Sequence, residues 1–141
     1  MHKGAAIFFT DNKSVLLLKI AGDNSDSETW CLPGGTAKEG ETPHETAVRE
    51  AQEETGLKKI PGSQFTSITS QNGDKTFVVY FYKVDAPFDV SLSKEHTDWT
   101  WTPLKKMASK SLHPKLEKHL DDYLDAVGGS RKSFSESLFV N

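Results

Sequence analysis

The sequence predicts one α/β domain, in which strand-like segments build a sheet and two helical segments pack on it. Short apolar and β-branched segments bounded by turn residues predict the strands. Capping signals and a four-residue leucine spacing predict the helices. The chain has 141 residues, 35% of them hydrophobic and 26% charged, a composition typical of one globular domain. We expect that domain over residues 1–129, followed by a C-terminal tail over residues 130–141.

The first third of the chain predicts the start of the sheet. Residues 4–10 and 14–21 are apolar, and Asp11 and Asn12 between them are turn residues, a pattern that predicts a β-hairpin. Residues 22–29 are polar and turn-rich, so we expect a surface loop there.

A helix is predicted over residues 43–55. Thr42 suits the N-cap, Pro43 the first helical position, and Glu45 completes a capping box. Gly56 supplies the C-terminal stop.

The remainder predicts more strands and a second helix. Residues 65–70 and 76–84 are strand-like with turn residues between them, and residues 99–102 are a further short strand candidate. From Leu104 onward the pattern is that of one amphipathic closing helix that stops at the glycines 128 and 129. Its apolar face has a leucine at positions 112, 116, 120 and 124. The tail is expected either as a loose segment or as a short docked strand around Leu138, Phe139 and Val140.

Composition limits the function classes. The formal net charge of −3 gives no general electrostatic reason to bind long nucleic acid. The single cysteine, Cys31, forms neither an internal disulfide nor a CxxC site, so we expect a reducing compartment, the cytoplasm. No segment resembles a membrane span or a cleavable signal, so no membrane role is expected. The sequence leaves the oligomeric state open.

Three carboxylates stand close together on the predicted helix. Glu50, Glu53 and Glu54 are spaced i, i+3 and i+4, which places them on one face. Like charges at this spacing cost about 0.2–0.5 kcal/mol per pair in an isolated helix. A divalent cation would remove that repulsion, and Mg²⁺ prefers such oxygen ligands. Taken alone, the three residues fit a solvated acidic face better than a metal site.

The residues around these carboxylates form a longer pattern. Gly35 is followed after five residues by Glu41 and after seven more by the run from Arg49 to Leu57, REAQEETGL. This resembles the Nudix box, GX5EX7REUXEEXGU with U an apolar residue, over its whole length. Ala51 is smaller than the residue usual at its position. The segment from Trp30 to Gly34 also resembles the one that leads into the box.

The resemblance implies a fold and a set of site residues. The fold is an α/β/α sandwich around a central mixed β-sheet, in which the box forms a loop, a helix and a loop. Glu50, Glu53 and Glu54, with a main-chain carbonyl near Gly35, are implied as ligands of Mg²⁺, with Mn²⁺ as an alternative. The loop at Gly34 and Gly35 would let the backbone approach metal and phosphates, since close approach and unusual dihedrals exclude a Cβ.

Catalytic roles follow from the same resemblance. Arg49 would pair with and orient Glu53, and Glu41 would assist it. The general base has two candidates, Glu53 and Glu95. Glu95 and His96 resemble an EH segment found before a tryptophan in several Nudix hydrolases. Taken alone, His96 fits a surface-loop histidine better than a substrate-binding residue.

Aromatic and basic residues offer further contacts to substrate. The aromatic residues that could stack on a base are Trp30, Phe88, Trp99 and Trp101, although such side chains more often belong to the core. The lysines at positions 105, 106, 110, 115 and 118 fit a solvated helix face better than a basic patch.

The resemblance therefore predicts a hydrolase that cleaves the diphosphate linkage of a nucleoside diphosphate joined to another group. Dinucleoside polyphosphates, nucleotide sugars and nucleoside triphosphates remain open as substrates, and the partner is a small nucleotide. The alternative is a catalytically silent module that senses a nucleotide or binds a protein, which predicts eroded glutamates. An RNA-end hydrolase is a third reading, disfavoured by the acidic net charge.

Overall fold

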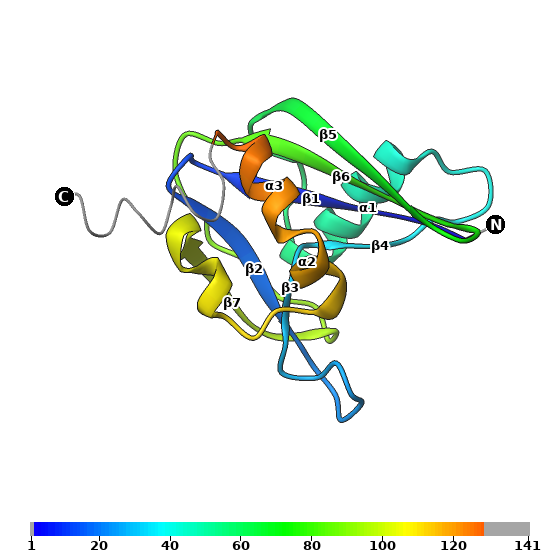
Figure 1. Cartoon of the computed structure of the whole chain (residues 1–141), viewed down its shortest axis with the longest axis horizontal. Coiled ribbons are helices and arrows are strands. Elements are labelled where there is room, and N and C mark those ends of the chain that lie inside the picture. The colour runs from blue at the N-terminus through cyan, green and yellow to red at the C-terminus, as the bar shows by residue number, and fades with distance from the viewer. Residues whose placement is uncertain (1, 129–141) are drawn as a thin grey trace.

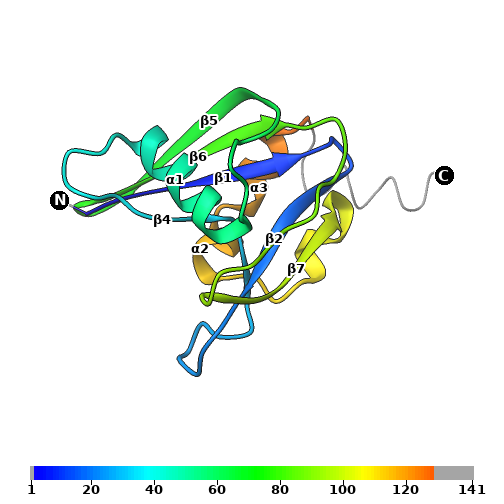
Figure 2. The same ribbon diagram turned by 180° about the vertical axis from the view of Figure 1, so that it is seen from behind.

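The computed structural model describes residues 2–128, which form a twisted sheet covered by helices on both faces (Figures 1 and 2). The sheet of the described residues has seven strands in the order β3-β2-β1-β6-β5, with β4 paired to β1 and β7 paired to β2. The elements are β1 His2–Thr10, β2 Ser14–Ile20, β3 Trp30–Cys31, β4 Gly34–Thr36, α1 Pro43–Thr55, β5 Ser63–Asn72, β6 Lys75–Lys83, β7 His96–Pro103, the 3-10 helix η1 Leu104–Ser109, α2 Pro114–Lys118 and α3 Leu120–Ala126.

The sheet is mixed because its central pair is parallel. β1 and β6 run parallel from His2 opposite Lys75 to Thr10 opposite Lys83, and the other pairings are antiparallel. A strand between covered faces buries alternate side chains in two separate cores. In β1, Ala5, Ile7 and Phe9 pack beneath α1, whereas Ala6 and Phe8 pack beneath α2 and α3. This arrangement confirms the predicted α/β/α sandwich.

The predicted hairpin is confirmed only at its turn. β1 and β2 pair at Thr10 and Val15. Farther along β2 this edge pairs with β3, while β7 pairs with the opposite edge of β2 from Ser14 to Ile20. The reason is that β4 takes the edge of β1 at residues 4–6, so β2 diverges from it. Figure 1 shows β2 leaving β1 at an angle.

Helix α1 has the predicted bounds because its signals are local. Thr42 Oγ1 accepts from the Glu45 N–H at 3.1 Å, and Glu45 Oε1 accepts from the Thr42 N–H at 2.9 Å. Gly56 ends the helix with a φ of 76°, which favours glycine. Ala47 and Ala51 are fully buried, so small side chains let the helix lie close to the sheet.

The prediction of one closing helix is wrong, since the segment forms η1, α2 and α3. His113 has an extended backbone, with φ −54° and ψ 141°, because Pro114 follows it. The N–H of His113 donates to the Trp30 carbonyl, and the N–H of Trp30 donates to the Ser111 carbonyl. The chain turns again at His119. The four-residue spacing still predicts which side chains are buried, because the leucines at 112, 116, 120 and 124 all join one core.

The predicted tail at residues 130–141 lies outside the described residues. Among residues 2–128, no helix has the length and apolar character needed to cross a membrane.

Candidate active site

The site begins where β4 lies against β1 and beneath α1. A Cβ on Gly34 would come within 2.5 Å of the Ala5 carbonyl oxygen, and a Cβ on Gly35 within 2.5 Å of the Glu50 carboxyl carbon. Both glycines are therefore required by close contact with other protein atoms, while their expected approach to metal and phosphates stays a prediction. The structure differs in two respects: the pair lies in a strand, and neither residue has a positive φ.

Glu54 is the buried carboxylate of the site. Its side chain comes from the last turn of α1, is 2% exposed, and accepts from the Gly34 N–H at 2.9 Å. Burial raises the pKa of Glu54 well above its usual range, and the neighbouring carboxylates of Glu50 and Glu95 raise it further. The Gly34 N–H acts in the opposite direction, because it stabilises the ionised form.

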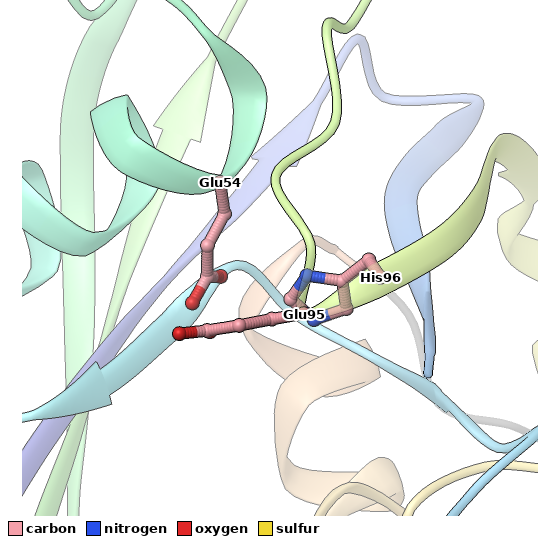
Figure 3. A group of neighbouring side chains, drawn as sticks. All are labelled: Glu54, Glu95 and His96. Atoms are coloured by element: carbon pink, nitrogen blue, oxygen red, sulfur yellow. The ribbon is translucent and has the colours of Figure 1, made fainter. Parts of the chain in front are cut away.

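A second segment brings Glu95 and His96 to this carboxylate. One ligand atom from each of Glu54, Glu95 and His96 lies within 4.8 Å of the others. Figure 3 shows the side chains of Glu54 and Glu95 directed toward the same space, the first from α1 and the second from the turn just before β7. The N–H of Ala21 donates to the Glu95 carbonyl at 2.9 Å, which ties this segment to β2.

His96 is not the surface-loop histidine that the sequence favours. It begins β7 and is 9% exposed, with Nε2 3.6 Å from the Cys31 Sγ. Burial lowers the pKa of His96 and raises the pKa of the Cys31 thiol to about 12, so both are neutral near pH 7. Nδ1 of His96 is buried and has no hydrogen-bond partner within residues 2–128.

Arg49 joins the acidic residues of α1 to the segment before it. Its Nε donates to Glu41 at 2.7 Å, and its Nη1 donates to Glu50 at 3.0 Å and to Glu53 at 3.1 Å. Its Nη2 donates to the Thr36 carbonyl at 3.1 Å. This hydrogen bonding lowers the pKa of Glu41 to about 2 and raises the pKa of Arg49. The guanidinium therefore fixes β4, the following loop and the helix relative to one another.

The predicted carboxylates do not share one environment. Glu54 is buried, and the Glu50 side chain is 14% exposed, whereas the Glu53 side chain is 52% exposed and contacts Arg49. The carboxylate brought next to Glu54 from a distant segment is Glu95. Carboxylates crowded in this way hold either a shared proton or a cation, and hard oxygen ligands suit Mg²⁺ or Mn²⁺. The donor set therefore fits a divalent metal.

A cavity of about 660 Å³ opens beside these carboxylates, on the α2 and α3 side of the sheet. Among the described residues, Glu54 and Glu95 are its acidic lining, and the basic lining includes Lys3, Lys75 and Lys115 together with Lys118. Lys115 and Lys118 are exposed, as expected of a solvated helix face, and they also line this cavity. Their positions depend on the break at Pro114, which residue spacing does not reveal.

The aromatic residues that the sequence offered for base stacking do not line this cavity. Phe88, Trp99 and Trp101 pack beneath α1, where Trp101 Nε1 donates to the Phe88 carbonyl at 2.9 Å. The Trp30 ring lies under Lys110 Nζ at 4.7 Å and does not line the cavity described above. The aromatic side chains that line it within residues 2–128 are Phe77 and Tyr123.

Comparisons with known proteins show the family of the chain. A family model described as NUDIX domain matches residues 1–125. The chain is 26% identical over 111 residues to 8-oxo-dGTP diphosphatase of Escherichia coli (strain K12), covering 79% of this chain and 86% of that protein. It is 27% identical over 122 residues to the asymmetrical bis(5'-nucleosyl)-tetraphosphatase of Mus musculus, covering 79% of this chain and 80% of that protein. Some other curated relatives are longer, and the chain spans less than half of their length.

The fold has close structural neighbours. The crystal structure of the Nudix hydrolase RenU from M. smegmatis superposes with a TM-score of 0.77 at 22% sequence identity, covering 89% of this chain and 84% of that chain.

Proposed function

The chain belongs to the Nudix family of hydrolases, and we propose that it uses Mg²⁺ to cleave the diphosphate linkage of a nucleoside diphosphate joined to another group. The observation that carries the proposal is the approach of Glu54 and Glu95, from separate segments, beside Gly34 and Gly35 at the wall of a cavity. Dinucleoside polyphosphates, nucleotide sugars and nucleoside triphosphates are the substrate classes. The names of the two relatives above refer to compounds of the first and last classes.

Glu54 and Glu50 would hold the metal, with the Gly35 carbonyl and Glu53 as further ligands. Bound Mg²⁺ would polarise the diphosphate and lower the pKa of the attacking water. The protein keeps this donor set rigid, because the Gly34 N–H positions Glu54 and Arg49 positions Glu50.

Glu95 is the better supported of the two candidate bases. It lines the cavity, whereas Glu53 does not and is engaged by Arg49. A base must reach the water that attacks the substrate, so a cavity position favours Glu95. His96 supports this segment from beneath through its contact with Cys31.

The reaction would take place in the cytoplasm on a small nucleotide. Cys31 is the single cysteine of the sequence and can form no internal disulfide, which supports a reducing compartment.

The test is turnover of a substrate panel in Mg²⁺, with products separated by chromatography. We expect one class to be cleaved, the reaction to need metal, and Glu54→Gln to abolish it. Glu95→Gln should lower kcat by about 10²–10⁴-fold, the range for loss of a general base, and Glu53→Gln should cost less. A larger loss in Glu53→Gln would move the base to that residue. If one compound binds with the same affinity to the wild type and to Glu54→Gln and neither protein cleaves it, the protein is a nucleotide-sensing module and not an enzyme.

A further inference from the structure

Lysines from three separate elements face the cavity beside the carboxylates. Lys3 comes from β1, Lys75 from β6, and Lys115 and Lys118 from α2. All four are exposed, and among ion pairs between described residues none includes any of them. Uncompensated positive charges gathered in a protein of net charge −3 repel one another unless an anion lies between them.

The lysines lie farther along β1 than the carboxylates. Gly34, which holds Glu54, pairs with Ala6, whereas Lys3 stands three residues earlier and Lys75 pairs with His2. Three residues of strand span about 10 Å. The cavity therefore has an acidic end suited to metal and a basic end well beyond it.

The floor of the basic end is an aromatic ring. Phe77 lies beside Gly4 on the parallel strand, and a Cβ on Gly4 would come within 2.9 Å of the ring. The absence of that Cβ lets the ring lie over β1. Lys115 Nζ is 5.7 Å from the Phe77 ring centroid, which holds this ammonium group in the cavity.

We infer that the basic end binds phosphates beyond the diphosphate at the metal, so that the substrate is a nucleotide with a chain of more than two phosphates. This rests on the proposed function. Each further phosphate adds negative charge that the metal at the acidic end does not reach. Lysine supplies point charges that suit a flexible phosphate chain. A nucleotide sugar with two phosphates leaves these lysines without a partner.

The first experiment compares substrates that differ in phosphate number alone. Diadenosine diphosphate and diadenosine tetraphosphate are offered to the wild-type protein in Mg²⁺, and kcat/KM is measured for both. We expect at least a tenfold preference for the tetraphosphate. Equal or better cleavage of the diphosphate overturns the inference and leaves the proposed function intact.

Two double variants then test whether the cavity lysines cause the preference for the tetraphosphate. The double variant Lys115→Gln with Lys118→Gln should lower kcat/KM for the tetraphosphate on the order of tenfold, because two exposed charge contacts are lost. Its kcat/KM for the diphosphate should change by less than about twofold. The control pair Lys105→Gln with Lys106→Gln removes the same charge from exposed positions of η1 outside the cavity. Equal losses in the two double variants, or on the two substrates, would assign the effect to general attraction and overturn the inference.

Binding of inorganic phosphates gives an answer independent of turnover. Calorimetry in Mg²⁺ compares tripolyphosphate with pyrophosphate on the wild type and on both double variants. We expect tighter binding of tripolyphosphate, lost only in the variant at positions 115 and 118. If no nucleotide is cleaved, the proposed function fails, and this measurement alone decides whether the lysines form a polyphosphate site.

Discussion

Gly35 is the residue whose replacement most directly tests the site geometry. A Cβ there would meet the Glu50 carboxyl carbon at 2.5 Å. We expect Gly35→Ala to displace this carboxylate and lower kcat by about 10²-fold, the order seen when catalytic groups move by an ångström.

Gly40→Ala is the matched control, because it lies in the same segment with no atom within 4 Å of its added Cβ. Its φ of 79° makes the substitution cost about 1–2 kcal/mol of stability. We expect kcat to remain near wild type. A larger loss of kcat at position 40 than at position 35 would contradict the close-contact explanation.

Glu41 should make the stability of the protein depend on acid pH. Its folded pKa is about 2, lowered by its hydrogen bond with Arg49 from an ordinary value of 4.5. A depressed pKa contributes stability that is present above pH 4.5 and is lost as the pH falls toward 2. The difference in melting temperature between wild type and Glu41→Gln should therefore shrink over this window. A difference that stays constant from pH 7 to pH 2 would show that the ion pair contributes nothing.

The site could be predicted from the sequence where its residues are neighbours in one segment. Glu50, Glu54 and Arg49 stand within two turns of a helix, so their spacing and the family pattern identify them. The approach of Glu95 to Glu54 is different, because it depends on β7 pairing with β2. The lysines of the cavity carry no sequence signal, since lysine is common on any exposed face.

At the scale of elements, α1 depends on its N-terminal cap. Thr42→Ala removes the side-chain oxygen that accepts from the Glu45 N–H, and we expect a loss of about 1 kcal/mol in the free energy of unfolding. Urea unfolding measures this loss. Thr42→Ser keeps the oxygen and should retain most of the stability. Equal losses in both variants would assign the effect to the threonine methyl group instead.

A helix or strand could be predicted from the sequence where the residues that determine it lie within or next to it in the chain. The capping box and Gly56 lie within the helix they delimit, so the bounds of α1 follow from the sequence. The leucines after Leu104 correctly predict which side chains are buried. They do not predict where the helix breaks, because the break is held by hydrogen bonds to Trp30, a residue far away in the chain.

At the scale of the whole molecule, the fold should not need the metal. Two apolar cores, one on each face of the sheet, are built without contributions from the acidic residues, and a chain of this size buries enough surface to be stable alone. We expect removal of metal with EDTA to leave the circular dichroism spectrum unchanged.

Mg²⁺ should nevertheless raise the melting temperature. A ligand at 100 times its Kd stabilises the state that binds it by about 2.7 kcal/mol. Glu54→Gln should reduce the shift, because it removes a proposed ligand and leaves the cores intact. An equal shift in wild type and variant would place the cation elsewhere.

The parallel pairing of β1 with β6 also determines the order in which the protein can fold during synthesis. Every register pair joins residues 73 positions apart, since His2 lies opposite Lys75 and Thr10 opposite Lys83. The apolar residues of β1, Ala5 to Phe9, are therefore made long before the strand that covers this edge. Such distant pairing slows folding and leaves a strand edge open to other chains. The nascent chain must keep β1 from aggregating until the next 73 residues have followed it out of the ribosome.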